Sequence, residues 1–438
     1  MTKSPTALNV LGQADGESIQ LGRLSYIERD QSAAFQWSQE ALDRKQEWSP
    51  LCMPLSSQLW VSGMREMDLM GLPGLIHDAL PDGWGMLLMD RAFIQAGVSR
   101  HRISPLLRLA FLSNRCWGAL SFVPEWGADI DKQHQVAIGA LAEEAQQVMH
   151  GDTDRVSQAL LVAGGSPHGA RPKVMVAVNN DLTQALVGQE DLPPGYRHVL
   201  IKFAGDGEGP THPVLEFCYT EAARAAGIQT APAALIEAGG RAGLCVDRFD
   251  RVDGQRRHVH SMAGMLHTTH RIANSDWLQV ADILNRLEGG EADLEQAFRR
   301  AVFNAVFCVR DDHTKNIAFM RRGNTWGLSP AFDIAYCDGP GGYHTMTYAE
   351  HQGRDVRRAD LLRLAEPFGV AEPEVDRLVE QMRGQRELML KEARSLGVAR
   401  PILAQVGARL KGIDKALKPA AGRVRRAKTA TPGSPSLR

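Results

Sequence analysis

The chain has 438 residues, of which 23% are charged, and its formal net charge is −1. The length allows two or three domains with hydrophobic cores, and the near-neutral charge gives no general reason to expect direct binding to nucleic acid or to an anionic membrane. Because the six cysteines lack zinc or disulfide spacing, and no apolar run is long enough for a signal peptide or a membrane span, we expect a cytoplasmic protein with free thiols and no membrane partner.

Residues 1–125 are the first predicted region, a β-rich N-terminal subdomain. Short apolar runs alternate with turns, and the region ends on the strand-like run WGALSFVPEW, in which Trp117 is expected to be a packing residue. Residues 126–260 alternate between two patterns. RPKVMVAVN and RHVLIKFAG have the Val and Ile content of strands, and VLEFCYTEAARAAG is an amphipathic helix that Gly227 ends. This region is therefore predicted to be a mixed α/β unit.

Residues 261–415 are dominated by helical periodicity, as in SDWLQVADILNRL and EVDRLVEQMRGQRELMLKEARSLG. After Asp414 the chain carries no acidic residue and is rich in Pro, Ala and Gly, so residues 416–438 are predicted to be a disordered basic tail. His267 and His270 lie within one helical turn, but no third metal ligand is apparent. We expect these two histidines at the surface or in a substrate cleft.

The stretch VFCVRDDHTKNIAF, residues 306–319, places polar side chains between two apolar runs. Asp311 and Asn316 lie five positions apart, as do the Asp that accepts a hydroxyl proton and the Asn that binds a metal in protein-kinase catalytic loops. Asp333, in the apolar run AFDIAY, supplies a further carboxylate. Phosphoryl transfer needs such groups to orient the hydroxyl and to hold a divalent metal. Taken alone, the spacing also fits a solvated loop after a helix.

Lys202, in the strand HVLIKF, has apolar neighbours, and its burial would require a nearby anion such as a phosphate. A lysine at a sheet edge whose amine reaches solvent is an equal alternative. Gly164, Gly165 and Gly169 precede a strand and would allow backbone N–H groups to face a phosphate. An ordinary turn before a strand would show the same glycines.

Taken together, the motifs resemble those of the HipA family of toxin–antitoxin serine/threonine kinases over about residues 70–415. The matching runs, in chain order, are LPDGWGMLLMDRAF, RLAFLSNRCWGALSFVPE, AGGSPHGARPKVMV, HVLIKF, VDRFDR, DDHTKN and AFDIAY. The resemblance implies an α+β, two-lobed protein-kinase-like fold with a mixed α/β N-terminal lobe, an extra N-terminal subdomain and an all-helical C-terminal lobe. Residues 126–260 would bind the nucleotide, and residues 261–415 would be the catalytic lobe.

The resemblance also implies roles for individual residues. Asp311 would be the catalytic base, and Asn316 and Asp333 would hold Mg²⁺. The residues expected around ATP are Gly164, Gly165, Ser166, Gly169, Lys173, Lys202, Asp247, Arg248, Phe249, His313, Lys315 and Phe332. Family members autophosphorylate a serine near the glycine-rich loop, for which Ser166 and Ser157 are the candidates here. The family archetype has its serine where this chain has Leu161, which departs from the family pattern.

The biological role that the resemblance implies is a toxin that phosphorylates a component of translation, possibly an aminoacyl-tRNA synthetase. Its partner would be a small helix-turn-helix antitoxin of the HipB type, through which any contact with DNA would be indirect. Two alternatives stay open. One is a small-molecule kinase of related fold, in which only the acceptor cleft differs. The other is a pseudokinase that acts as a regulatory module bound to an antitoxin–DNA complex.

Overall fold

The structure is a computed structural model that describes residues 5–127, 134–153, 155–165, 168–205, 211–351 and 353–418. Its N-terminal part is built on a five-stranded antiparallel sheet in the order β4-β3-β2-β1-β5. The strands are β1 (Ala7–Ala14), β2 (Glu17–Ile27), β3 (Ser32–Trp37), β4 (Trp60–Val61) and β5 (Leu120–Val123). Alternate residues of β1, among them Leu8 and Val10, are buried, because successive side chains of a strand point to opposite faces.

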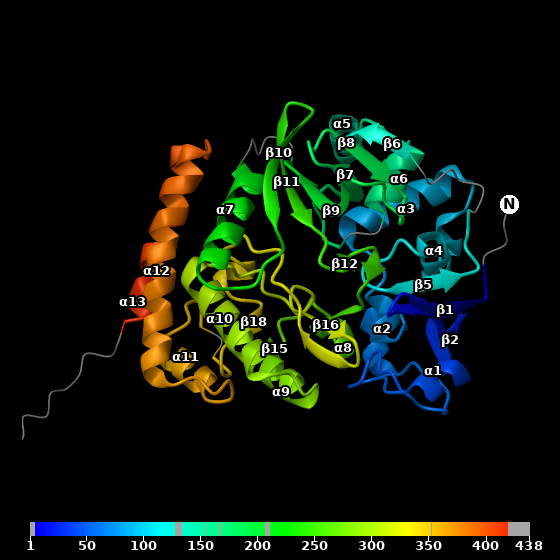
Figure 1. Ribbon diagram of the computed structural model, residues 1–438, viewed down its shortest axis with the longest axis horizontal. Helices are drawn as coiled ribbons and strands as arrows, with labels where there is room; N and C mark the ends of the chain where they lie inside the picture. The colour runs from blue at the N-terminus through cyan, green and yellow to red at the C-terminus, as the bar shows by residue number, and fades with distance from the viewer. Residues whose placement is uncertain are drawn as a thin grey trace, which may run out of the picture.

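Short helices connect and cover this sheet, and they lie at one end of the molecule (Figure 1). They are α1 (Gln39–Arg44), the 3₁₀ helix η1 (Met64–Leu69), α2 (Gly74–His77), α3 (Gly83–Gln95), the 3₁₀ helix η2 (Arg100–Arg102) and α4 (Pro105–Leu112). Helix α4 begins where a sequence would predict it, because the Ser104 hydroxyl accepts the Leu107 N–H at 3.2 Å and Pro105 occupies the first turn.

A second, six-stranded antiparallel sheet has the order β10-β11-β9-β7-β8-β6. Its strands are β6 (His134–Ala137), β7 (Lys173–Asn179), β8 (Gln184–Val187), β9 (Tyr196–Phe203), β10 (Ala233–Ala238) and β11 (Arg241–Asp247), with helices α5 (Ile138–His150), α6 (Gln158–Gly164) and α7 (Thr211–Ala225). One hydrophobic core contains residues of both sheets, from Leu8 to Cys245. The domain boundaries proposed near residues 125 and 260 stay predictions.

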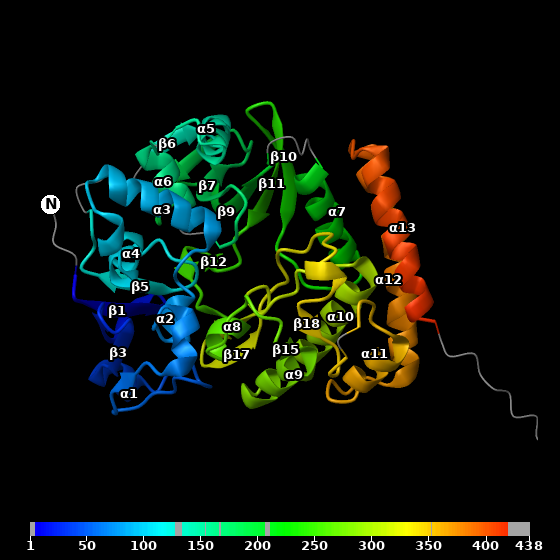
Figure 2. The same ribbon diagram turned by 180° about the vertical axis from the view of Figure 1, so that it is seen from behind.

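The C-terminal half is mainly helical, with α8 (Met262–Met265), α9 (Trp277–Arg286), α10 (Glu291–Phe307), α11 (Arg358–Ala365), α12 (Glu372–Ser395) and α13 (Arg400–Ala416). Its core runs from Val214 of α7 to Leu417. Helices α12 and α13 lie at the opposite end of the molecule from β1 and β2, as the views from both sides show (Figures 1 and 2). Residues 419–438, most of the predicted basic tail, lie outside the described residues.

The prediction of an all-helical C-terminal lobe was wrong. Strands β14 (Val259–Ser261), β16 (Ala318–Arg322) and β17 (Thr325–Leu328) form a three-stranded sheet, and β15 (Ser275–Asp276) pairs with β18 (Met346–Thr347). Gly323, at φ +61°, and Asn324 make the two-residue turn between β16 and β17, which is a common hairpin turn chemistry. Strands of two to five residues have too few alternating positions to be recognised in a sequence dominated by helical periodicity.

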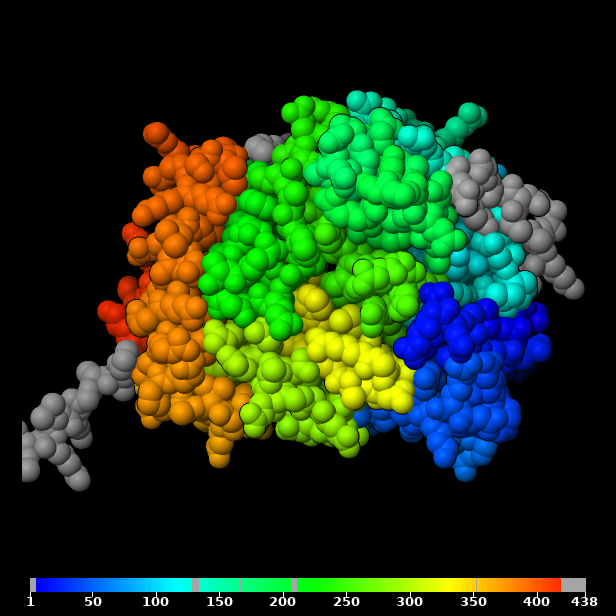
Figure 3. All heavy atoms as spheres, viewed as in Figure 1, coloured from blue at the N-terminus to red at the C-terminus, as the bar shows by residue number. Residues whose placement is uncertain are grey.

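Smaller elements complete the described fold: β12 (Arg251–Val252) pairs with β13 (Gln255–Arg256), and the 3₁₀ helix η3 spans Pro340–Gly342. Segments far apart in the sequence lie side by side at the centre of the face in Figure 3, where the green part of the chain meets the yellow part. An isolated parallel bridge between Thr230 and Ala331 marks this contact. Within the described ranges, no helix is long and apolar enough to cross a membrane.

Candidate functional site

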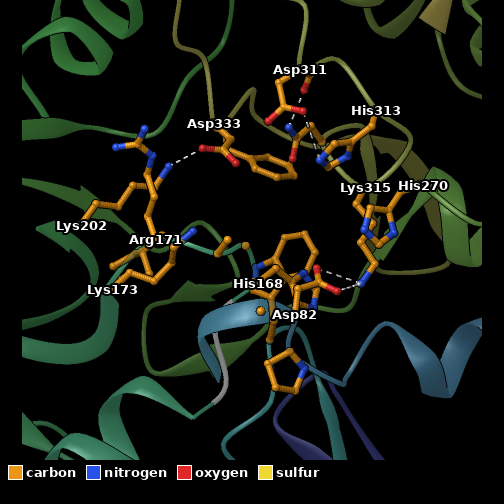
Figure 4. Close-up of a pocket in the computed structure, with 18 of the residues that line it drawn as sticks. Asp82, His168, Arg171, Lys173, Lys202, His270, Asp311, His313, Lys315 and Asp333 are labelled. Atoms are coloured by element: carbon orange, nitrogen blue, oxygen red, sulfur yellow. Dashed lines mark hydrogen bonds and ion pairs between the residues drawn. The ribbon is translucent and has the colours of Figure 1, made fainter. Parts of the chain in front are cut away.

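A cavity of about 1070 Å³ lies where the six-stranded sheet, the C-terminal half and the N-terminal part meet. Its lining includes these residues predicted from the sequence: Gly169, Lys173, Lys202, Asp247, Arg248, Phe249, Asp311, His313, Lys315, Asn316, Phe332 and Asp333. Figure 4 shows the labelled charged and histidine side chains converging on one space, with Lys202 and Asp333 on one side and Lys315 and His270 on the other. The fold therefore gathers residues that are separated by more than 100 positions in the chain.

The polar stretch after α10 divides its residues between the interior and the cavity. Arg310, 1% exposed, donates to the carbonyl of Gly342 and to the Asp355 carboxylate, the latter at 2.7 Å. Asp312 is buried and accepts the Thr345 N–H at 2.9 Å and a hydrogen bond from the His344 ring at 2.8 Å. These two inward residues fasten the stretch to the segment 342–346. Asp311, His313, Lys315 and Asn316 are thereby held at the cavity.

Lys202, on β9, is the central cation of the site. Its ammonium lies 2.5 Å from a carboxylate oxygen of Glu216 on α7 and 2.5 Å from one of Asp333. Burial by itself lowers the pKa of Lys202, but the charges of Asp333 and Glu216 outweigh burial and raise the pKa above its usual value. The charge of Lys202 holds the pKa of Asp333 far below its usual range. Lys202 and Asp333 are therefore ionised at neutral pH, whereas burial raises the pKa of Glu216.

Lys173, on β7, faces Lys202 directly across the two paired strands. It is 5% exposed, and burial, followed by the nearby charge of Lys202, lowers its pKa to about 8. Gly169 lies against this amine: a Cβ on Gly169 would come within 2.4 Å of the Lys173 Nζ, and its φ is +90°. The positive φ favours glycine at this position, and a larger residue would also displace the amine. Two ammonium groups thus lie together beneath the loop that approaches β7, a position suited to phosphates.

Asp311 and Asn316 form the opposite wall. The Asn316 side-chain N–H donates to the Asp311 carbonyl at 2.7 Å, which leaves the Asn316 amide oxygen available as a ligand. The Asp311 carboxylate lies 3.8 Å from the His313 ring. Burial raises the pKa of Asp311; the His313 charge opposes this rise, and the charge of Asp333 adds to it. A carboxylate whose pKa is raised by burial and by a neighbouring carboxylate is a stronger proton acceptor.

The donor atoms at the site fit Mg²⁺. Asp333 offers a carboxylate and Asn316 an amide oxygen, and oxygen donors are what Mg²⁺ prefers. In the described part of the chain there is no group of three or more His, Cys, Asp or Glu placed to hold a metal. Mg²⁺ at this site would therefore take its other ligands from phosphates and water, as is usual where it is bound with a nucleotide.

Lys315 is held by an acid that sequence reasoning missed. Its buried ammonium lies 3.0 and 3.1 Å from the two carboxylate oxygens of Asp82, which precedes α3. Burial raises the pKa of Asp82, but the charges of His168 and Lys315 outweigh it and hold the pKa far below its usual range. Asp82 lies in the run LPDGWG of the N-terminal part. This ion pair therefore joins the N-terminal part to the polar stretch after α10 at the cavity wall (Figure 4).

Three aromatic rings from separate segments face one another at the cavity. The ring centroids of Trp117 and Phe249 are 6.1 Å apart, those of Trp117 and Phe332 5.5 Å, and those of Phe249 and Phe332 5.7 Å. Trp117, expected only to pack, lines the cavity as the other two do. The segment that carries Phe249 is fixed to the N-terminal part, because buried Asp250 accepts the Gly118 N–H at 2.8 Å. Aromatic faces of this kind stack on nucleobases.

Some predicted residues lie elsewhere. Gly164 and Gly165, at the end of α6, pack against Trp84, Leu88 and the Leu161 carbonyl and are not among the lining residues. The Ser157 hydroxyl caps α6 by accepting the Leu160 N–H at 3.1 Å, and it donates to Glu144 at 2.7 Å. Ser157 does not line the cavity. Ser166 lies outside the described residues.

The lining residues Asp82, His212 and Glu216 had no prediction, whereas His168 and Arg171 lie in the run AGGSPHGARPKVMV that was expected to approach the phosphates. Glu216 could have been found, because a kinase lysine on a strand is expected to pair with a glutamate on the next helix. No local sequence pattern around Asp82 predicts its ion pair with Lys315. His270, placed by the sequence at the surface or in a substrate cleft, does line the cavity.

Comparisons with known proteins agree with this arrangement. The family model of the HipA-like C-terminal domain matches residues 165–388, and that of the HipA N-terminal domain matches residues 16–123. A search of curated proteins gives no match.

Among solved structures, the HipA chain of a Shewanella oneidensis toxin–antitoxin complex with HipB and operator DNA has a TM-score of 0.65 and 18% identity. The match covers 93% of this chain and 96% of that one. A Helicobacter pylori proinflammatory kinase, CtkA, has a TM-score of 0.30 and 11% identity over 48% of this chain and 92% of that one, a likeness too low to indicate a common fold.

Proposed function

The chain belongs to the HipA family, and from this premise we propose that it is an ATP- and Mg²⁺-dependent serine/threonine protein kinase that acts as a HipA-like toxin. The observation that carries the proposal is the arrangement of Lys202 between Glu216 and Asp333, with Asp311 and Asn316 in the same cavity. A strand lysine paired with a helix glutamate, a catalytic Asp with an Asn five residues later, and a further metal-binding Asp are the parts that protein kinases use.

Each part has a distinct task in phosphoryl transfer. Lys202 and Lys173 attract the phosphates of ATP, and the rings of Trp117, Phe249 and Phe332 offer stacking surface for the base. Mg²⁺ held by Asn316 and Asp333 would neutralise charge on the phosphate oxygens.

Asp311 takes the proton of the acceptor hydroxyl while the hydroxyl oxygen bonds to the terminal phosphorus of ATP. The bond from that phosphorus to the bridging oxygen breaks, and ADP leaves. Because Asp333 contacts Lys202 at 2.5 Å, nucleotide binding has to exchange part of this ion pair for contacts with phosphate and metal.

The direct test is the Asp311→Asn variant. We expect phosphoryl transfer from ATP in the presence of Mg²⁺ to fall by at least about 10²-fold, the usual contribution of a general base. MgATP binding, followed by calorimetry, should remain, because Asp311 contacts the acceptor rather than the phosphates. Transfer is measured by mass spectrometry of the protein and of serine peptides. A fully active Asp311→Asn variant would contradict the catalytic assignment.

We also propose a helix-turn-helix antitoxin of the HipB type as the partner, and a component of translation, such as an aminoacyl-tRNA synthetase, as the substrate. The support for the partner is the Shewanella complex, which contains HipA, HipB and operator DNA; the near-neutral charge of this chain is consistent with DNA contact through the antitoxin. Ser157 and Ser166 remain the candidates for autophosphorylation. Phosphorylation of Ser157 would remove the cap of α6, since its hydroxyl is the capping group.

A further inference from the structure

The 3₁₀ helix η1, Met64–Leu69, carries two highly exposed methionines beside the cavity. Met64 is 88% exposed and Met67 is 72% exposed. In a 3₁₀ helix, side chains three positions apart lie one above the other. Met64 and Met67 therefore share the outer face of η1, whereas Glu66 and Leu69, also three apart, share its buried face.

The buried face fixes η1 to the C-terminal half. The Glu66 carboxylate accepts the Gly63 N–H at 2.7 Å and lies 2.7 Å from the Nδ1 of His267, just after α8. The other ring nitrogen of His267 accepts the Gly74 N–H at 3.1 Å, so Nδ1 carries the proton and donates to Glu66. The two methionines thus stand on a support held by buried hydrogen bonds rather than on a loose loop.

The same support leads to the catalytic wall. The segment after His267 continues through His270 to Ile272, and both of these residues line the cavity, as does Met67. Ile272 is 58% exposed. The rings of His270 and His313 have their centroids 5.2 Å apart, and Figure 4 shows His270 at the edge of the cavity next to Lys315. Met67 and Ile272 thus stand in the lining of the cavity that contains Asp311, and Met64 lies on the same face of η1 as Met67; these three residues are here called the apolar rim.

A small acceptor enclosed in the cavity would not contact Met64, because Met64 does not line the cavity. Exposed apolar groups at the mouth of a cavity are typical of binding surfaces, and methionine side chains are flexible and polarisable enough to fit apolar partners of different shapes. Leu59 and Val61, which precede η1 in the chain, are also exposed, at 57% and 58%. A serine or threonine presented to Asp311 within a polypeptide would bring its neighbouring residues towards the rim.

We propose that the apolar rim docks the acceptor polypeptide through apolar residues that flank the serine or threonine to be phosphorylated. This proposal rests on the kinase function proposed above and narrows its substrate class. Burial of one or two such side chains against the rim lowers the KM for the acceptor, whereas binding of MgATP does not involve the rim.

The test compares three forms of the full chain: wild type, the double variant Met64→Ser/Met67→Ser, and the control Met149→Ser. Met149, on α5, is 45% exposed and does not line the cavity. Two peptide pools that contain one serine are used, with either leucine or asparagine fixed at the flanking positions. Phosphorylation with MgATP is followed by mass spectrometry, MgATP affinity by calorimetry, and oligomeric state by light scattering.

We expect wild type and Met149→Ser to have a kcat/KM about tenfold higher for leucine-flanked peptides, the effect of burying one apolar side chain. The double variant should lose this preference through a higher KM, with unchanged MgATP affinity. An independent variant, Ile272→Asn, should reduce the preference in the same direction.

Retained preference in both variants would overturn the docking proposal and leave the kinase intact. The same conclusion would follow if the double variant changed only the oligomeric state, because the rim would then be a contact between copies of the chain. If wild type binds MgATP but phosphorylates neither pool nor any protein, the proposed kinase function itself fails.

Discussion

The ammonium of Lys202 is shared by two carboxylates that have different tasks. Glu216 contacts the lysine from α7, whereas Asp333 is the acid proposed above to hold the metal. Two carboxylates flank this buried ammonium, and the ammonium of Lys173 lies opposite Lys202 on the neighbouring strand, so that removing one member leaves a buried charge less well compensated. Without Glu216, Lys202 would pair with Asp333 alone of its two carboxylate partners in the described structure. The lysine would then compete with the metal proposed for Asp333.

For Glu216→Gln we therefore expect kcat/KM for ATP to fall by about tenfold to hundredfold, which corresponds to ~1.4 to 2.8 kcal/mol of transition-state stabilisation. Steady-state kinetics with varied MgATP measures this. The matched control is Glu221→Gln on the same helix, because Glu221 pairs with Arg224 at the surface. Equal losses in the two variants would indicate a general effect on α7 rather than the role given to Glu216.

Lys173 gives the site a pH dependence in the physiological range. Its pKa of about 8 results from burial and, after that, from the charge of Lys202. Below this pKa the amine is charged and attracts phosphate; above it the amine is neutral. Nucleotide affinity should therefore fall as the pH rises through about 8.

The measurement is the MgADP dissociation constant by calorimetry between about pH 6.5 and 9. Wild type should weaken over this range, whereas Lys173→Met should bind weakly at every pH and show a flat profile. Lys411, a basic residue of α13 outside the cavity lining, provides the control variant Lys411→Met, which should follow wild type. A flat wild-type profile would contradict the assignment of Lys173 to phosphate binding.

At the scale of elements, two adjacent aspartates of the stretch after α10 have different roles. Asp311 points to the cavity, and Asp312 points inward to the Thr345 and Met346 N–H groups at 2.9 and 3.3 Å. Asp312 joins the catalytic stretch to the segment that leads into β18. Its carboxylate therefore determines where Asp311 lies without contacting substrate.

We expect Asp312→Ala to reduce the free energy of unfolding by about 3 kcal/mol, because buried N–H groups and His344 lose their acceptor. Asp311→Asn should unfold at nearly the wild-type denaturant concentration. Guanidinium unfolding followed by circular dichroism compares the two variants. Equal stabilities would show that Asp312 does not anchor the stretch.

At the scale of the whole molecule, buried polar bonds hold the N-terminal part on the C-terminal half. Asp78, just after α2, lies 2.6 Å from the Nδ1 of His260 and accepts the Ser261 hydroxyl at 2.7 Å; the His260 Nε2 lies 3.0 Å from the Ser49 hydroxyl. The order Ser–His–Asp is that of hydrolase triads. Here all three members are buried, and neither Ser49 nor His260 lines the cavity described above, so we assign these hydrogen bonds a structural role.

This contact predicts a loss of stability in acid. Burial raises the pKa of Asp78, but hydrogen bonds from His260 and Ser261 and the charges of His260 and Lys315 outweigh it, and the pKa lies far below its usual range. The resulting stability is present above the unfolded pKa, about 3.9, and is lost as the pH falls below it.

Between about pH 5 and pH 3 the melting temperature should therefore fall more steeply in wild type than in Asp78→Asn, which is less stable at neutral pH. Differential scanning calorimetry at several pH values gives both slopes. Parallel slopes would mean that Asp78 does not contribute to the acid sensitivity.

The sequence alone determined the chemical types at the site and the order of the main elements. Lys202 in an apolar strand, the Asp311–Asn316 spacing and Asp333 in an apolar run are local patterns, and local patterns report which side chains are forced into unfavourable surroundings. Periodicity likewise located β7 and β9 of the six-stranded sheet and the long C-terminal helices. It missed β16, because a strand of five residues within a helical region is too short to establish a period.

Only the tertiary structure decided which distant groups complete the site. Asp82 reaches Lys315 from 233 positions away, Trp117 faces Phe332, and η1 is fixed to the segment after α8 by Glu66. Ion pairs and ring contacts of this kind depend on how the N-terminal part lies on the catalytic half, and no spacing within one segment encodes that. Local sequence sets what a side chain requires, whereas long-range packing sets which partner meets the requirement.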